Sequence, residues 1–205
     1  MSYYRDLIRT IGLPGLATFA SLASSWTAIG LVLANQPKYA ILAGTLAFQL
    51  DILDGYLARK LNKSSEFGRQ LDSLSDVINY SVLSALVTSQ YLLPAPFGYL
   101  IGFCILAFGV LRLALFNLQG FTEEGDVLYY RGIITCNLSL AALLAYILGE
   151  LLPVADWPWW DWLVAGVLFL LAVGQISRIK NRKSGVLIFW IPVSILLAVG
   201  SFLWL

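Results

Sequence analysis

Seven long apolar runs constrain the fold of this 205-residue chain more than any other feature. They cover residues 15–35, 39–58, 71–93, 96–118, 132–152, 159–176 and 185–205. A helix needs about 20 residues to cross a bilayer core, and these runs are continuously apolar, whereas barrel strands would alternate. Because 59% of the residues are hydrophobic and only 12% are charged, a soluble globular domain is excluded. The pattern predicts an all-α, polytopic membrane helix bundle.

The residues before the first run have a different character. Arg5, Asp6 and Arg9 are interspersed with tyrosine, leucine and isoleucine up to Pro14. This pattern predicts an amphipathic helix at residues 1–13 that lies on the membrane surface and ends before the proline. The first six spans then occupy residues 14–183, and residues 184–205 form an additional C-terminal span. We expect no cleavable signal peptide.

The basic residues fall almost entirely on one side of the predicted spans. Twelve of the 13 share a side: Arg5, Arg9, Arg59, Lys60, Lys63, Arg69, Arg112, Arg131, Arg178, Lys180, Arg182 and Lys183. Only Lys38 lies on the other side. The positive-inside rule therefore places the N-terminus in the cytoplasm and the C-terminus outside. We expect a multi-pass protein of a prokaryotic plasma (inner) membrane, with an outer aromatic belt around Trp157, Trp159, Trp160 and Trp162.

Four carboxylates occur where isolated charges are unfavourable. Asp51 and Asp54 end the second run, and Asp72 and Asp76 begin the third. Their spacings of three and four put each pair on one helix face, and a short connection brings the two helices together. The chain has no histidine, and Cys104 lies inside an apolar run. The four carboxylates therefore suit Mg²⁺, Mn²⁺ or Ca²⁺ rather than zinc or copper.

Other interpretations of these acids remain open. They could pair with Arg59, Lys60, Lys63 and Arg69 in a solvated cluster, or mark the pathway of a cation-coupled transporter. Small residues nearby indicate either close helix packing or the approach of a ligand to the backbone: Gly44, Ala47, Gly55, Ala58 and Gly68. Packing alone does not explain four acids.

The acids belong to a longer motif. Asp51-Ile-Leu-Asp-Gly-Tyr-Leu-Ala-Arg59 is followed after eight residues by Gly68-Arg-Gln-Leu-Asp-Ser-Leu-Ser-Asp76. This segment resembles the signature of the CDP-alcohol phosphatidyltransferases, and all eight signature residues are present. Eight fixed positions within 26 residues make a chance agreement negligible.

The resemblance implies six core membrane helices, a polar cavity open to the cytoplasm, a homodimer, and transfer of a phosphatidyl group from a CDP-lipid to an alcohol with release of CMP. It assigns Asp51, Asp54, Asp72 and Asp76 to divalent metals, two Mg²⁺ or Mn²⁺ ions or Ca²⁺, and makes Asp76 the general base as well. The residues that it assigns to the CDP-lipid are Gly55, Ala58, Arg59, Ser65 and Gly68.

The segment Leu111-Arg-Leu-Ala-Leu-Phe-Asn117 is similar to the phosphatidylserine synthase branch. That likeness implies L-serine as the acceptor. Arg112 could bind the acceptor carboxylate or the lipid phosphate, and Asn117 is a further candidate for contact with the acceptor. We expect no nucleic-acid partner. The chain departs from the branch at Leu115, at Asn79-Tyr80-Ser81 and at Gly132-Ile133-Ile134. Glycerol 3-phosphate, inositol phosphate or choline therefore remain alternative acceptors. Arg112 could instead snorkel at a helix end.

Overall fold

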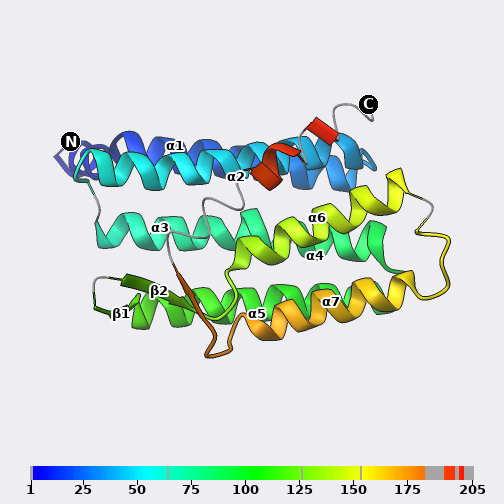
Figure 1. Ribbon diagram of the computed structural model, residues 1–205. Coiled ribbons are helices and arrows are strands. Elements are labelled where there is room, and N and C mark those ends of the chain that lie inside the picture. The colour runs from blue at the N-terminus through cyan, green and yellow to red at the C-terminus, as the bar shows by residue number, and fades with distance from the viewer. Residues whose placement is uncertain are drawn as a thin grey trace.

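The computed structural model describes residues 2–63, 65–125, 127–152, 154–182, 192–196 and 199–200, and within them six helical rods pack lengthwise (Figure 1). The rods begin with α1 Ser2–Leu33 and α2 Pro37–Lys60. The third rod runs through α3 Glu66–Asp76, η1 Val77–Val82, α4 Leu83–Val87 and η2 Thr88–Leu92. The last three are α5 Phe97–Gln119, α6 Thr135–Leu151 and α7 Trp160–Gly174. The chain is thus a mostly helical bundle, as predicted.

Three helices in the described residues are long and apolar enough to cross a bilayer: Ile11–Leu33, Pro37–Lys60 and Phe97–Gln119. Apolar α6 and α7 are shorter. The third rod contains two π-helical segments, and η1 follows Asp76 directly. The predicted seventh span, 185–205, lies mostly outside the described residues, so the total number of spans stays a prediction.

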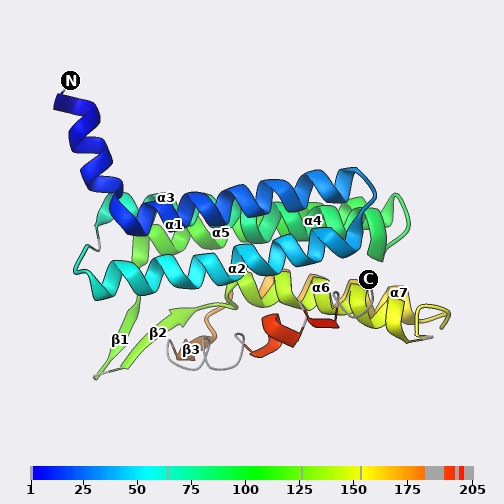
Figure 2. The same cartoon turned by 90° about the horizontal axis from the view of Figure 1, so that it is seen from above.

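The first helix changes direction near its beginning. Gly12 has φ 54° and ψ −165°, and Pro14 follows two residues later. Figure 2 shows the turns before this kink leaving the bundle. Glycine tolerates a positive φ that a side chain would disfavour. The kink lies where the sequence predicted a break, while the amphipathic character of residues 1–13 stays a prediction.

A small antiparallel sheet lies at the end of the bundle where α2 ends and α3 begins, hereafter the sheet end (Figure 1). Its strands are β1 Thr122–Glu124, β2 Val127–Arg131 and β3 Lys180–Arg182, in that order. Strand β2 consists mainly of branched and aromatic residues, which favour strands, and Gly125 (φ 59°) supplies the turn before it. The all-α prediction did not include this sheet, which adds to the predicted helical bundle.

Gly132 fixes how this sheet joins the bundle. Its φ is 74°, and a Cβ atom there would lie 1.9 Å from the carbonyl oxygen of Gln175. Its amide donates to the oxygen of Ile179 at 2.8 Å, and its own oxygen accepts from Asn181 Nδ2 at 2.8 Å. A larger residue would therefore separate β2 from the end of α7.

Candidate active site

A cavity of about 720 Å³ lies at the sheet end of the bundle. Residues from α1, α2, the third rod, α5, α6 and the sheet contribute to its wall. Its polar lining includes the four acids that the sequence singled out: Asp51, Asp54, Asp72 and Asp76. The antiparallel arrangement of α2 and α3 explains this convergence, because α2 ends and α3 begins at the same end of the bundle.

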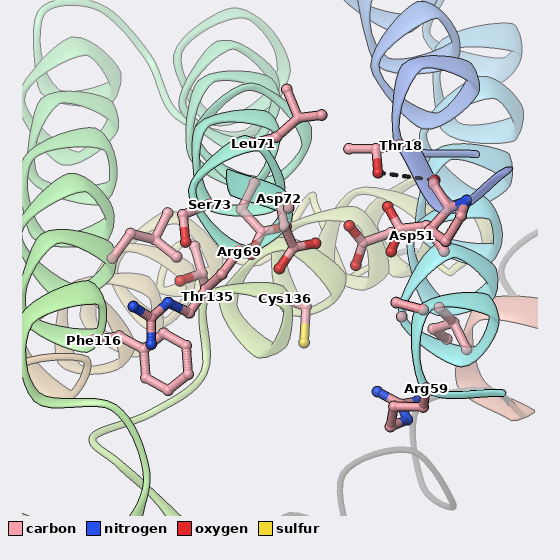
Figure 3. A pocket seen from close by; sticks show the side chains of 18 of the residues that line it. Thr18, Asp51, Arg59, Arg69, Leu71, Asp72, Ser73, Phe116, Thr135 and Cys136 are labelled. Carbon is pink, nitrogen blue, oxygen red and sulfur yellow. Dashed lines mark hydrogen bonds between the residues drawn. The ribbon is translucent and has the colours of Figure 1, made fainter. Parts of the chain in front are cut away.

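Three of the acids form a tight group. Oxygen atoms of Asp51, Asp72 and Asp76 all lie within 4.8 Å of one another. Figure 3 shows Asp51 on α2 and Asp72 on the third rod facing each other across the cavity. Asp54 lines the same cavity and is only 4% exposed, but it does not belong to this group.

The carboxylates keep unused acceptor atoms. Within the described residues, Asp51 Oδ1, Asp54 Oδ2 and Asp76 Oδ1 are buried and accept no hydrogen bond. Asp51 Oδ2 is occupied, since the Tyr80 hydroxyl donates to it at 2.8 Å. Buried anionic oxygens at this separation repel one another unless a cation lies between them. The donor set therefore fits a hard divalent ion.

Salt bridges do not satisfy these acids. Ion pairs among the described residues include Arg69 with Glu66, at 3.8 Å, and Lys180 with Glu124. Neither includes any of the four aspartates. Arg59 interacts electrostatically with Asp54 and Asp72, but the described residues show no direct ion pair that would support the solvated salt-bridge cluster.

The residues expected to contact the CDP-lipid also line the cavity: Gly55, Ala58, Arg59, Ser65 and Gly68. A Cβ on Gly55 would lie 3.3 Å from an Arg59 guanidinium nitrogen, so glycine leaves room for that side chain. Ser65 begins α3 as its N-cap, because its Oγ accepts from the Gly68 amide at 3.0 Å. These residues share one wall with the acids.

Arg112 on α5 also lines the cavity. It is 5% exposed, and its Nη1 donates to Thr135 Oγ1 at 3.1 Å. Its guanidinium lies over the rings of Phe116 and Tyr130, with Cζ 5.7 and 6.0 Å from their centroids. It interacts electrostatically with Asp76. A snorkelling arginine would expose its head to water, so that alternative was wrong.

Asn117 is placed differently from what the sequence suggested. Its Oδ1 accepts from Ser73 Oγ at 2.9 Å, and its Nδ2 donates to Gln70 Oε1 at 3.0 Å. It is not among the described residues that line the cavity. Its amide connects α5 to α3, and its role toward the acceptor stays a prediction.

A protein-family model describes most of the chain. The model for CDP-alcohol phosphatidyltransferase matches residues 11–204. The chain belongs to this family. The aspartate motif at the cavity is therefore the CDP-alcohol phosphatidyltransferase motif in its expected structural setting, a helical bundle with membrane-spanning helices.

Several curated relatives in the family carry serine-specific names. CDP-diacylglycerol–serine O-phosphatidyltransferase of Mycobacterium leprae (strain TN) is 39% identical over 180 residues, which is 83% of this chain and 58% of the relative. The enzyme of the same name from Mycobacterium tuberculosis (strain H37Rv) is 39% identical over 106 residues, 51% of this chain and 37% of the relative. Archaetidylserine synthase of Methanothermobacter thermautotrophicus is 36% identical over 112 residues, which is 52% of this chain and 47% of the relative. The chain thus spans between about a third and three-fifths of these relatives.

In this member of the CDP-alcohol phosphatidyltransferase family, the structure adds lining residues to which the sequence gave no role in the site: Thr18, Tyr80, Phe116, Tyr130, Thr135 and Cys136. Tyr80 lies four residues after Asp76, one helical turn along the third rod, and that spacing was the available signal. Burial raises the pKa of Tyr130 to about 12, against the opposing effect of the Arg112 guanidinium. The Tyr130 phenol is therefore neutral near pH 7.

Proposed function

We propose that this protein transfers a phosphatidyl group from CDP-diacylglycerol, or a related CDP-lipid, to L-serine, with release of CMP. The observation that carries the proposal is the group of three carboxylates within 4.8 Å in a bundle cavity, with two oxygens that accept no hydrogen bond from described residues. Family membership and the serine-specific names of the relatives support the same reaction.

Asp51, Asp54, Asp72 and Asp76 would hold the divalent cations, two Mg²⁺ or Mn²⁺ ions or, less suited to compact sites, Ca²⁺. When bound, such ions neutralise the diphosphate and stabilise the charge that develops on the departing nucleotide. The free oxygens of Asp51, Asp54 and Asp76 support this assignment. Without a cation, four acids would repel an anionic substrate.

The wall that carries Arg59 and Ser65 would bind the CDP moiety. Gly55, Ala58 and Gly68 have little or no side chain, so the nucleotide can approach the backbone there. The same cavity has an apolar border formed by Ile11, Pro14, Phe67 and Leu71, which suits the lipid side of the substrate. One cavity can therefore accept a molecule that is polar at one end and apolar at the other.

In the reaction, the serine hydroxyl oxygen attacks the phosphorus that carries the lipid. A new P–O bond forms to serine, and the bond from that phosphorus to the CMP oxygen breaks. Asp76 receives the hydroxyl proton as general base. Arg112 lines the same cavity and would bind the serine carboxylate through its planar fork.

The surrounding assembly is part of the proposal. The 12 to 1 distribution of basic residues supports a cytoplasmic N-terminus and a cytoplasmic opening of the cavity, in the plasma membrane of a prokaryote. We infer a homodimer from the family resemblance. Serine and the nucleotide would then arrive from water while the acyl chains remain in lipid.

A direct assay tests the proposal. Purified protein in detergent receives CDP-diacylglycerol, Mg²⁺ or Mn²⁺, and either labelled serine or labelled glycerol 3-phosphate. We expect labelled lipid and stoichiometric CMP with serine, and loss of both with EDTA. If no alcohol causes CMP release, the enzymatic proposal is wrong and the alternative is a cation-coupled transporter.

Glycerol 3-phosphate is the second candidate acceptor, and one observation favours it. Five basic residues line the cavity, more than the sequence indicated: Arg59, Lys63, Arg69, Arg112 and Arg182. An anionic phosphate would gain from that charge. The same assay decides between the two acceptors, because labelled lipid forms from only the preferred one.

A further inference from the structure

The sheet forms part of the cavity wall. The cavity is lined by Val127, Leu128, Tyr130 and Arg182 of the sheet, and by Phe121 just before β1. These residues come from the connection between α5 and α6 and from the segment after α7. Tyr130 of the sheet lies against Arg112, so the sheet contacts the site through that arginine.

Arg112 is held on several sides. Tyr130 and Phe116 pack against its guanidinium, and Thr135 accepts from Nη1. The rings also pack on one another, since Tyr130 lies 5.8 Å from Phe116 and 4.9 Å from Phe121, centroid to centroid. An aromatic cluster therefore restricts the plane of the arginine fork.

One edge of the fork is left unused. Within the described residues, Arg112 Nε is buried and donates no hydrogen bond. A buried N–H of a charged group is unfavourable without an acceptor. Because the side chain lines the cavity, an anionic oxygen of a bound molecule can supply that acceptor.

The position of Tyr130 depends on a distant part of the chain. Tyr130 is paired with Asn181 across β2 and β3, and the Asn181 side chain donates to the oxygen of Gly132. The ring that packs on Arg112 is therefore fixed by the segment after α7.

We propose that Tyr130 on β2 and Thr135 at the start of α6 are positioning residues that hold the Arg112 fork for the carboxylate of the acceptor, so that the sheet is part of an acceptor-specificity element. The proposal rests on the proposed function, because it concerns the acceptor in that same reaction. It adds that selectivity for a carboxylate requires residues outside the signature motif and outside α5.

The test compares two acceptors that differ only in the group Arg112 would bind. Serinol replaces the carboxylate of serine with a hydroxymethyl group and keeps the amine and a reactive hydroxyl. The ratio of kcat/KM for serine to that for serinol measures carboxylate recognition. We expect Tyr130→Leu to lower this ratio about tenfold and to leave the KM for CDP-diacylglycerol unchanged.

Matched variants separate positioning from general damage. Tyr130→Phe keeps the ring and should retain a ratio close to wild type. Tyr129→Leu changes the same residue type on the opposite face of β2, and Tyr129 is not among the described residues that line the cavity. It should leave the ratio unchanged. Thr135→Val removes the acceptor for Nη1 at nearly constant volume and should lower the ratio, while Thr135→Ser restores it.

The outcomes distinguish a failure of the positioning proposal from a failure of the proposed serine reaction. If Arg112→Lys lowers the ratio but Tyr130→Leu and Thr135→Val do not, the sheet has no role in specificity and the proposed function stands. If wild type uses serine and serinol equally, carboxylate recognition by Arg112 is wrong. If wild type transfers to neither, the serine reaction itself is wrong. Should Tyr130→Leu fail to fold, the Thr135 pair still decides whether the Arg112 fork is positioned for the carboxylate.

Discussion

The sheet end and the opposite end of the bundle use their buried side chains in different ways. At the opposite end the core is mainly apolar and carries no charge among its most buried residues, with Ile101, Leu143, Ile147 and Val164 all under 7% exposed. At the sheet end, side chains of comparable burial carry charge, as in Asp54 at 4% and Arg112 at 5%. Close packing of the core at the opposite end stabilises the fold whether or not a ligand is present.

The sheet end behaves differently because its buried carboxylates repel one another until metal ions and substrates bind. Three carboxylate oxygens within 4.8 Å repel one another. In addition, one buried polar atom each of Asp51, Asp76 and Arg112 has no hydrogen-bond partner among the described residues. Such an arrangement is unfavourable for folding alone. Substitutions at the sheet end should therefore change activity more than stability, and substitutions at the opposite end should do the reverse.

The largest effect on activity should come from Asp72→Asn. It removes a negative charge from the three-carboxylate group at constant volume, so transfer should fall below detection while thermal unfolding in detergent is unchanged or slightly improved. Asp51→Asn and Asp54→Asn should behave alike. Glu66→Gln is the control, because it removes an acid from the same helix at a side chain that is 83% exposed. A strongly destabilised Asp72→Asn protein would show that the acids are structural.

Asp76→Asn should separate proton transfer from metal binding. If Asp76 acts chiefly as the base, kcat should fall by roughly 10²–10⁴-fold while metal and CDP-lipid bind nearly as in wild type. Isothermal titration calorimetry of both ligands, beside turnover, checks this. Loss of metal binding in step with turnover would make Asp76 a ligand first and leave the general-base assignment without support.

Tyr80→Phe should have an intermediate effect. The substitution removes the hydroxyl that donates to Asp51 Oδ2 and keeps the ring, which packs edge-on against Phe48. Loss of a group that orients a metal ligand commonly weakens metal affinity about 10–100-fold. A Mn²⁺ titration of activity measures the shift. An unchanged titration midpoint would mean that the phenol only packs.

Arg112→Lys should act on one substrate. Lysine keeps the charge but not the planar fork, so the KM for serine should rise about tenfold and the KM for CDP-lipid should change less. Steady-state kinetics with each substrate varied in turn gives both values. The acceptor role of Arg112 is wrong if neither KM moves.

The smallest effect on catalysis should come from the opposite end of the bundle. Leu143→Ala removes a side chain that is 3% exposed in the mainly apolar core, and such truncations cost about 2–5 kcal/mol of unfolding free energy. The unfolding temperature in detergent should fall clearly, while activity per folded molecule stays at the wild-type value. A large loss of specific activity without loss of stability would show that the two ends are coupled.

The sequence alone predicted the helical bundle and the convergence of the acids, because both follow from local patterns. Long apolar runs specify helices in a membrane, and spacings of three and four put Asp51 with Asp54 and Asp72 with Asp76 on common faces. The sequence did not predict the sheet, because β2 and β3 lie about 50 residues apart and a three-residue strand such as β3 has almost no local signal.

Side-chain orientation was decided by tertiary structure alone. Arg112 and Asn117 lie five residues apart on α5, and the sequence assigned both to the acceptor. Packing turns Arg112 into the cavity between Tyr130 and Phe116, while Asn117 bonds to Ser73 and Gln70. Residue type and spacing thus determined which groups are available on each helix. Which of them meet in one cavity depends on contacts between segments far apart in the chain, and only the folded bundle brings those segments together.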